Sequence, residues 1–554
     1  MTPEELSKTI KESLESLISS LKIEVSVIPE IKIERPKSKE HGDFSSNIAL
    51  MVAKPAGKNP RDVAQLLVDD LSKNPGIKKI EIAGPGFLNF TLDSASLGEL
   101  ARTIIEQSDK YGHTDLLKGE TINIEFISAN PTGPMHMGNA RGGALGDSMA
   151  AVLDFAGYDV TREFYLNDAG NQIEKFGASL SARYLQECGV DVEFQEDWYQ
   201  GEDIKARAKE FIENNGEKFV NCSDDERKAA LVDYSLAKNV EMMKKTLAGY
   251  RINYDIWYYE SELYKSGEVE ETVALLKEKG YTYEKEGAIW FRASEDGEKD
   301  DVLVRANGIP TYFAADIAYH RNKFVTRGFD RVIDVWGADH HGHVARMKSA
   351  MDAVGVKSDS LEVVLMQLVR LMRGGEVARM SKRTGKAITL DDLLDDIGIN
   401  AARFFFNMRN AGSHFDFDLD LAVEQSNNNP VYYVQYAHAR ICSIIRLLSE
   451  DGVNVRKASK VDITLLTQPE ELDLIRKISE LPDEIKAASD ILEPSRMTRF
   501  AMDLANAFHS FYNACRVKVD DEELLHARLK LIDSVRITLA NVLSILAVDA
   551  PEKM

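Results

Sequence analysis

A strand-like run that leads into a turn rich in proline and glycine is the most constraining feature of this chain. The run Ile122–Ile127 is followed by Ala129–Asn139, which contains His136 and Gly138. A helix that begins directly after a strand exposes unpaired N–H groups and the positive end of its dipole, and together these bind anions. Gly138 would let a nucleotide approach the backbone closely. Alone, His136 is equally consistent with a structural turn, but the whole segment predicts a phosphate site.

A second segment, far along the chain, carries several cations. It is Arg379–Lys386, which follows Gly374 and Gly375 and contains Lys382. The glycines predict a mobile loop, and the compact charge of a lysine suits the β- and γ-phosphates of a nucleotide. By itself this segment favours a solvated basic loop. Together with the upstream turn it favours adenylate chemistry driven by ATP.

The order of strand-like and helix-like runs predicts three domains. At 554 residues the chain is long enough for three to four, with about 150 residues in each. We expect a small α/β domain at 1–93, a Rossmann-like α/β domain with a parallel sheet and helical insertions at 94–425, and an all-helical bundle at 426–554. The best strands of the sheet are 122–127, 160–165, 331–336 and 361–371, and 202–250 is expected to be a helical insertion. The bundle helices are expected at 431–448, 470–488, 494–515 and 523–547.

Composition excludes several classes of protein. The net charge of −22 argues against a broad basic surface, so any phosphate site must be local. The four cysteines form no Cys-x-x-Cys pair, which argues against structural zinc and predicts free, buried thiols in a reducing cytoplasm. The first residues have no signal-peptide pattern, and no apolar run approaches the ~20 residues that span a bilayer. We expect a cytoplasmic monomer without a membrane partner.

The two phosphate segments resemble the signature motifs of class I aminoacyl-tRNA synthetases. His136–Asn139 is similar to the HIGH motif and Arg379–Arg383 to the KMSKS loop of that class. The surrounding sequence resembles the arginyl-tRNA synthetases over essentially the whole chain. The stretches that carry this closer resemblance are 128–134, 336–340, 383–385, 432–440, 511–517 and 550–554.

Three positions depart from these motifs. Asn139 stands where the HIGH motif has its second histidine, and an asparagine can still donate to nucleotide oxygens. Arg379 replaces the first lysine of KMSKS and keeps its charge, while Arg383 stands in place of the last serine. Lys382 retains the second lysine. We therefore expect retained activity and altered ATP affinity.

The resemblance implies that the chain attaches arginine to tRNA(Arg) through an arginyl-adenylate. His136, Asn139 and Lys382 would be the catalytic residues, with Lys382 and Mg²⁺ neutralising the departing pyrophosphate. Asp339 and His340 follow a predicted strand, where open α/β sheets bind ligands. The expected ATP-binding residues are Pro131, Gly133, His136, Gly138, Asn139, Asp339, His340, Met380, Ser381 and Lys382.

The resemblance also assigns the arginine site. Tyr312 and Asp316 would meet the guanidinium from one helical face, with Glu260 as the second carboxylate. Ser128 and Asn130 would hold the backbone groups of the amino acid. Without the resemblance, Asp316 is equally a surface helix acid and Glu260 an acid of a solvated loop. The cluster His340, His341 and His343 suggests a metal site, but no carboxylate or cysteine clearly completes it, so we expect no metal.

The domains at the two ends are expected to meet the tRNA. The segment His41–Asp43 resembles part of the family's extra N-terminal domain, which contacts the tRNA elbow. In the bundle, the tRNA-binding candidates are Tyr433, Tyr436, Arg440, Arg446 and Arg516, of which only a minority is expected to touch RNA because several lie on apolar faces.

Two alternatives to this enzyme stay open at this point. A cysteinyl-tRNA synthetase shares a related C-terminal bundle but would need zinc-binding cysteines near the catalytic turn, and this sequence has none there. A non-catalytic, tRNA-binding paralogue would normally have lost one of the two phosphate motifs, and both are retained.

Overall fold

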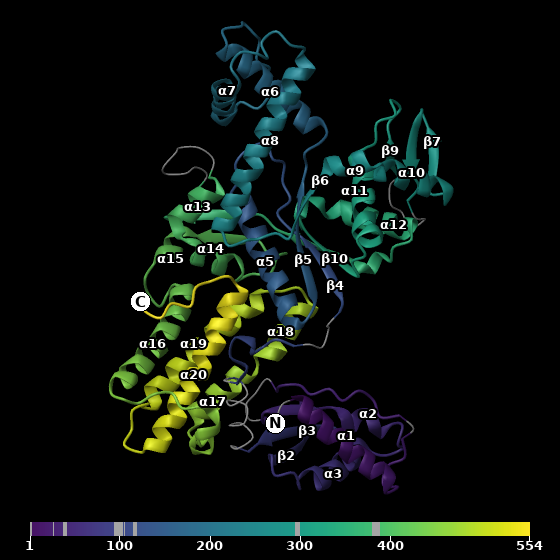
Figure 1. Cartoon of the computed structure of the whole chain (residues 1–554). Helices are drawn as coiled ribbons and strands as arrows, with labels where there is room; N and C mark the ends of the chain where they lie inside the picture. Colours follow the sequence, from purple (N-terminus) through teal and green to yellow (C-terminus); the bar gives the residue numbers. More distant parts are fainter. Residues whose placement is uncertain are drawn as a thin grey trace.

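The computed structural model describes residues 3–25, 27–36, 41–93, 104, 106–114, 119–293, 300–378 and 388–554. The segment Arg379–Lys386, with Met380, Ser381 and Lys382, lies outside the described residues. Figure 1 shows a small N-terminal unit at the lower right, a central α/β unit with a helical arm above it, and a C-terminal helical bundle at the lower left. This architecture confirms the predicted fold class.

The N-terminal unit is an antiparallel sheet of order β1-β3-β2 packed against helices. Leu6, Ile10 and Leu14 recur at helical spacing and are buried, so the first helix turns its apolar face inward. Gly42 has φ +86°, and a Cβ there would lie 2.5 Å from the Phe90 carbonyl oxygen, so only glycine fits. The elements are α1 (Pro3–Ser19), β1 (Phe44–Ser46), α2 (Ile48–Ala53), α3 (Pro60–Leu71), β2 (Ile77–Ala83) and β3 (Phe87–Leu92).

The central unit is built on a five-stranded parallel sheet, as far as the described residues go. Its order is β11-β10-β4-β5-β6. The strands are β4 (Thr121–Glu125), β5 (Asp159–Leu166), β6 (Ile256–Tyr259), β10 (Arg331–Gly337) and β11 (Leu361–Met366). β4 buries the polar Asn123 and Glu125 as well as Ile122 and Ile124, because a parallel strand of this kind is covered on both faces. The carboxyl ends of the strands share one edge, where ligands bind in open α/β sheets.

Helices and two insertions surround this sheet. The helical arm at the top of Figure 1 joins β5 to β6 and has a core of its own around Phe176, Tyr184 and Phe211. Its helices are α6 (Asn171–Glu187), α7 (Glu202–Asn215) and α8 (Asp224–Gly249). The second insertion carries a small antiparallel sheet, β7 (Thr282–Lys285), β8 (Ala288–Phe291) and β9 (Asp301–Val304). The other helices are α5 (Gly138–Ala156), α9 (Glu260–Ser266), α10 (Glu268–Glu278), α11 (Tyr312–Arg321) with the π-helical turn η3 (Asn322–Thr326), and α12 (His341–Val354).

A linking region leads from the central unit into the bundle. It contains β12 (Val369–Arg373), β13 (Glu376–Val377), α13 (Leu390–Ile397), α14 (Ile399–Phe406), β14 (Phe415–Asp418) and α15 (Leu419–Val423). The bundle follows with α16 (Pro430–Glu450), α17 (Pro469–Ser479), α18 (Leu481–Asp490), α19 (Ser495–Ala514) and α20 (Glu522–Ile545). Arg403 of α14 is fully buried and bonds both Asp147 of α5 (2.5 Å) and the Leu546 carbonyl (2.9 Å), so it ties the central unit to the bundle.

Two predicted elements are wrong in detail. The strand expected at 361–371 is two strands, β11 and β12, because the chain turns at Gln367, whose amide donates to the Ala411 carbonyl. The helix expected at 470–488 is broken into α17 and α18, and Pro482 stands at the start of the second helix.

The cysteines and the helix lengths bear on two further expectations. Cys188, Cys222, Cys442 and Cys515 are all free thiols, but only Cys515 is buried. Within the described ranges, no helix has both the length and the apolar character that crossing a bilayer requires.

Candidate active site

The turn before α5 has the geometry of an anion site. Its helix begins at Gly138, two residues after His136. The Nδ1 of His136 accepts the Gly138 amide (3.1 Å), and the His136 amide donates to Asn139 Oδ1 (3.1 Å). A Cβ at Gly138 would lie 3.2 Å from His136 Nδ1, so glycine keeps the turn tight. His136 and Gly138 are exposed, and Asn139 is half-buried beside them. The start of the helix is thus open to a ligand.

The segment that follows the cationic stretch lies on this turn. The Met137 amide donates to the Ile388 carbonyl (3.1 Å), and the Leu390 amide donates to the Met135 carbonyl (2.9 Å). Ile388 is the first described residue after 379–387. Two segments far apart in the sequence therefore meet at the His136 turn.

Contacts from the helical arm support the rest of the turn. Pro131 is buried, and its carbonyl accepts the side-chain amide of Asn239 from α8 (2.8 Å). A Cβ at Gly133 would lie 3.6 Å from a carboxylate oxygen of Asp203 on α7. The arm therefore bonds the turn at Pro131 and lies beside it at Gly133.

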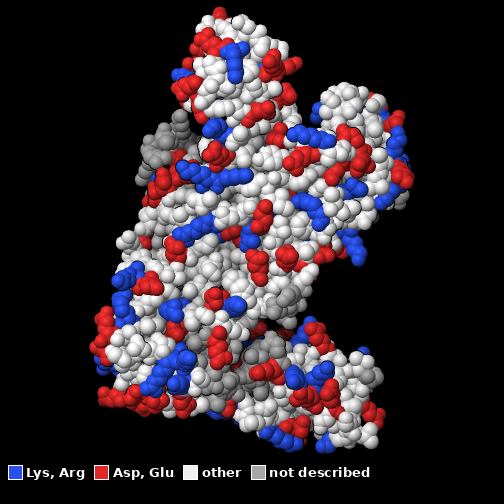
Figure 2. Space-filling model, in the orientation of Figure 1, with Lys and Arg blue, Asp and Glu red and all other residues white. Residues whose placement is uncertain are grey.

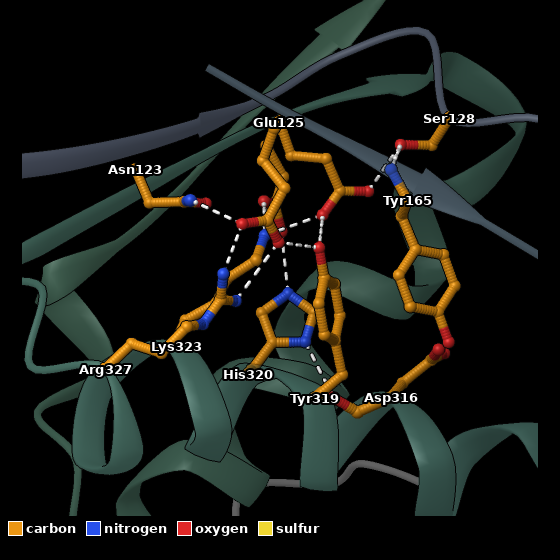
Figure 3. Close-up of polar contacts among 11 residues, drawn as sticks. Asn123, Glu125, Ser128, Tyr165, Asp316, Tyr319, His320, Lys323 and Arg327 are labelled. Atoms are coloured by element: carbon orange, nitrogen blue, oxygen red, sulfur yellow. Dashed lines mark hydrogen bonds and ion pairs between the residues drawn. The ribbon is translucent and has the colours of Figure 1, made fainter. Parts of the chain in front are cut away.

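A cavity of about 260 Å³ opens at the carboxyl edge of the sheet. Ser128, Tyr165 and Asp316 are among its walls. The Oγ of Ser128 donates to Glu125 Oε1 (2.7 Å) and accepts the Tyr165 amide (3.2 Å), which fixes its position (Figure 3). The complete lining is Glu125, Ile127, Ser128, Tyr165, Asn167, Asp316, Tyr319, His320, Val335, Trp336, Gly337, His340 and His343.

Carboxylates gather at one end of this cavity. Asp316 lines it, and its Oδ2 lies 3.1 Å from His343 Nε2. Glu260, at the start of α9, is 1% exposed and accepts the side-chain amide of Asn167 (3.2 Å), which also lines the cavity. Burial raises the pKa of Glu260 to about 7, and the nearby charges of Asp316 and Asp168 act in the same direction. The hydrogen bond from Asn167 opposes this shift. This end of the cavity therefore favours a cation.

Not every residue that was predicted to bind the arginine substrate lies on the cavity wall. Tyr312 is half-exposed at the first position of α11 and lines a neighbouring pocket with Gly170 and Tyr264. Tyr312 therefore faces a pocket beside the cavity that Asp316 lines, and the joint contact of the two residues with the guanidinium stays a prediction. Asn130 is half-buried in the segment after the Ser128 position.

The residues that follow β10 differ in whether they line the cavity. His340 lines the cavity, whereas the Asp339 side chain is 81% exposed and is not part of the lining. His341 is exposed. His343 lines the cavity and pairs with Asp316. In the part of the chain that the structure describes, no group of three or more His, Cys, Asp or Glu side chains is arranged to hold a metal ion.

The tRNA candidates also divide by exposure. Arg446 and Arg516 are exposed. Tyr433 and Tyr436 are half-buried on α16, with both rings packed against His509 at 5.0 and 6.1 Å between centroids. Arg440 is also half-buried and donates to the Tyr512 hydroxyl (2.7 Å).

At the N-terminal domain, Asp43 is buried in an ion pair with Arg476 of α17. Its other oxygen accepts the Leu92 amide (2.7 Å). Asp43 therefore joins two domains, while His41 beside it is exposed.

Sequence reasoning missed several residues of the cavity. Glu125, Asn167, Tyr319, His320 and Trp336 line it. A signal for the first was present, because an acid at the end of the apolar strand Ile122–Glu125 has few reasons to be there except a function.

Three family profiles match the chain in order. The profile described as arginyl tRNA synthetase N terminal domain matches residues 4–92. The one described as tRNA synthetases class I (R), catalytic domain, matches 101–428, and the DALR anticodon binding domain matches 434–554.

Similar proteins cover nearly the whole chain. An arginine--tRNA ligase of Acetivibrio thermocellus is 55% identical over 554 residues, 99% of this chain and 98% of that protein. One of Ruminiclostridium cellulolyticum is 57% identical over 531 residues, 95% of this chain and 94% of that protein. The solved Thermus thermophilus arginyl-tRNA synthetase has the same fold, with a TM-score of 0.75 at 22% identity and coverage of 100% of both chains. The chain therefore belongs to the class I arginyl-tRNA synthetases.

Proposed function

We propose that this arginine--tRNA ligase works in two steps at the cavity that follows β4. In the first step, a carboxylate oxygen of L-arginine attacks the α-phosphorus of ATP, and the bond to pyrophosphate breaks. In the second, a ribose hydroxyl of the terminal tRNA adenosine attacks the acyl carbon, and AMP leaves. The substrate supplies the nucleophile in both steps, so the protein contributes positioning and charge stabilisation.

The main support for this proposal is the proposed arginine-binding site. Asp316 on the cavity wall and the buried Glu260 would receive the guanidinium, which binds carboxylates bidentately. Ser128 and Asn130 would receive the amino-acid backbone groups. The single observation behind this orientation is that the buried Glu260 stands near Asp316, whose charge adds to the burial that raises the pKa of Glu260. A bound guanidinium would offset that charge.

The nucleotide seat is proposed at the His136 turn. The exposed start of α5 and its helix dipole suit a phosphate, and His136 and Asn139 would contact it. Pro131, Gly133 and Gly138 would shape the backbone around the nucleotide, and His340 would approach from the cavity side. Asp339 is exposed toward solvent and would reach ATP only from outside the cavity. Met380, Ser381 and Lys382 are proposed to act on the pyrophosphate. Mg²⁺ would enter bound to the ATP phosphates and share in neutralising their charge.

The tRNA is proposed to meet the bundle and the N-terminal unit. Figure 2 shows Lys and Arg side chains interspersed with Asp and Glu on the displayed face, and a hollow between the N-terminal unit and the central unit. Arg446 and Arg516 would contact phosphates because they are exposed. Tyr433, Tyr436 and Arg440 would offer stacking surface only along their exposed edges. The proposed domain limits remain 1–93, 94–425 and 426–554.

Aminoacylation with purified components tests this function. The chain, ATP and labelled L-arginine are incubated with tRNA(Arg), and charged tRNA and AMP are measured; lysine and a non-cognate tRNA serve as controls. We expect AMP and charged tRNA with arginine and tRNA(Arg) only. Binding of the tRNA without AMP formation would instead identify a non-catalytic paralogue.

A further inference from the structure

Three carboxylates lie side by side on the central sheet, just below the cavity. Asp334 of β10 is the register partner of Glu125 on β4, and Glu125 is the register partner of Glu163 on β5. Their exposed fractions are 0%, 7% and 0% in that order. Like charges on neighbouring strands repel, and buried charges must be paired. This acidic row therefore needs cations close to it.

The side chains that bond these acids come from one face of α11 and its π-helical extension. Tyr319, Lys323 and Arg327 recur at four-residue spacing, so they lie along one side of the helix facing the acidic row (Figure 3). Arg327 pairs with Glu163. The Tyr319 hydroxyl donates to Glu125 Oε2 (2.7 Å) and also bonds Glu163. This face fits the row residue by residue.

Lys323 occupies the centre of this arrangement. It is fully buried, and its Nζ donates to Glu125 Oε2 (2.6 Å) and Asp334 Oδ1 (3.0 Å). Burial opposes its charge, but Asp334 and Glu125 outweigh burial and raise the pKa of Lys323 to about 12. One ammonium thus compensates two of the three acids.

Both acids that bond Lys323 are connected by further hydrogen bonds to opposite walls of the cavity. The second oxygen of Glu125 accepts the Ser128 hydroxyl (2.7 Å). The second oxygen of Asp334 lies 2.7 Å from His320 Nε2, and His320 Nδ1 lies 2.7 Å from the Asp316 carbonyl oxygen. Glu125 and His320 themselves line the cavity. The ammonium is therefore linked to the Ser128 end and to the Asp316 end of the same site.

We propose that Lys323 is a positioning residue for the amino acid, since it holds Glu125 and Asp334 where they set Ser128 and the Asp316 turn of α11 at opposite walls of the cavity. This inference rests on the proposed arginine seat. Lys323 does not touch the substrate; it fixes the distance between the groups that do. A methionine of similar length would fill its space but remove the ammonium shared by Glu125 and Asp334, and the two walls would lose their common anchor.

The test is Lys323→Met, with arginine binding measured by calorimetry and steady-state kinetics for each substrate. We expect the arginine dissociation constant and KM to rise by about tenfold to a hundredfold, while the KM for ATP stays within about twofold because the His136 turn has its own supports. Arg331→Met is the matched control: Arg331 lies on the same strand as Asp334 but pairs with Glu362, away from the cavity. It should lose stability and keep its arginine affinity.

A folded Lys323→Met variant with unchanged arginine affinity would overturn the inference. If that variant does not fold, the arginine affinity of Tyr319→Phe is measured in its place, because this change removes only the hydroxyl that Glu125 and Glu163 share. We expect a smaller loss of arginine affinity, about threefold to tenfold, and no loss would overturn the inference. Asp316→Ala distinguishes failure of this inference from failure of the proposed arginine site. If Asp316→Ala leaves arginine binding intact, the proposed site itself is wrong. If Asp316→Ala weakens arginine binding but Lys323→Met and Tyr319→Phe do not, the site is retained and the positioning role of Lys323 is rejected.

Discussion

The Met137 amide and the Ile388 carbonyl share a 3.1 Å hydrogen bond. It joins the turn at the start of α5 to the residue directly after the stretch 379–387. The chain just after that stretch therefore lies against the turn, and the cavity lined by Ser128 and Asp316 opens at the carboxyl edge of the same sheet. Predictions for this site follow from the charges around it.

Asp316→Ala should weaken arginine binding by at least about an order of magnitude, because losing one partner of a buried charge pair costs ~2–5 kcal/mol. The KM for ATP should change little. Pyrophosphate exchange at varied arginine concentration measures both constants. Asp359→Ala, an exposed acid outside the cavity lining, is the control. Wild-type arginine constants in Asp316→Ala would reject the seat.

The pKa of Glu260, raised to about 7 from an ordinary 4.5, makes arginine binding depend on pH. The folded protein favours the neutral acid, so without arginine its stability falls as pH rises from about 4.5 to about 7. A guanidinium needs the ionised acid, so arginine should bind more weakly below pH 7 and release a proton there. Calorimetry in buffers of different ionisation enthalpy measures this proton, and thermal shifts by arginine should be larger at pH 8 than at pH 6. Glu260→Gln should bind arginine weakly, without proton release.

Lys382→Ala should slow aminoacylation strongly and leave arginine affinity nearly unchanged. The reason is that a lysine charge is needed on the departing pyrophosphate, where it acts in the transition state and not on the amino acid. Single-turnover rates and equilibrium arginine binding separate the two effects. Lys357→Ala, an exposed lysine after α12, serves for comparison. An unaltered rate in Lys382→Ala would remove the role given to this residue.

Arg403→Met should lower the free energy of unfolding by about 3 kcal/mol, near the low end for a broken buried pair. Asp147 keeps Arg162 at 3.4 Å, which limits the loss. Arg370→Met breaks an exposed bidentate pair with Asp416 and should cost less than about 1 kcal/mol. Urea unfolding of both variants makes the comparison, and equal losses would contradict the tie between the central unit and the bundle.

Arg446→Ala and Arg516→Ala should each weaken tRNA(Arg) binding and reduce the slope of log affinity against log salt by about one for each lost phosphate contact. Arginine binding should not change. Filter binding at several salt concentrations measures the slope. Arg499→Ala on the first half of α19 offers a comparison in the same bundle, and identical slopes in all three variants would remove these residues from the interface.

The sequence predicted what depends on local pattern. The turn Ala129–Asn139 follows a strand and starts a helix because its prolines and glycines fit only that geometry. The bundle helices and the hairpin of β2 and β3 were also predictable from spacing and turn residues. The break at Pro482 was readable too, since the residue before a proline avoids helical geometry.

Burial across long distances could not be predicted in the same way. The stretch around Lys323 and Arg327 has the composition of a solvated helix end, and only the fold places it against Glu125 and Asp334. The four-residue spacing puts Tyr312 and Asp316 on one face of α11, but it could not show that Tyr312 lines a pocket beside the one that Asp316 lines. Spacing defines a face of a helix, and the fold decides what lies opposite it.

Strand β4 pairs with β5 on one side and β10 on the other, and Thr121 bonds Asp330 across 209 residues of chain. During translation, β4 leaves the ribosome long before β10 exists. The N-terminal unit and the helical arm have enough local contacts to form early, while one edge of β4 stays unpaired. The cavity at the carboxyl edge, which β10 helps to line, is thus completed late, and a truncated nascent chain would present an open strand edge to chaperones.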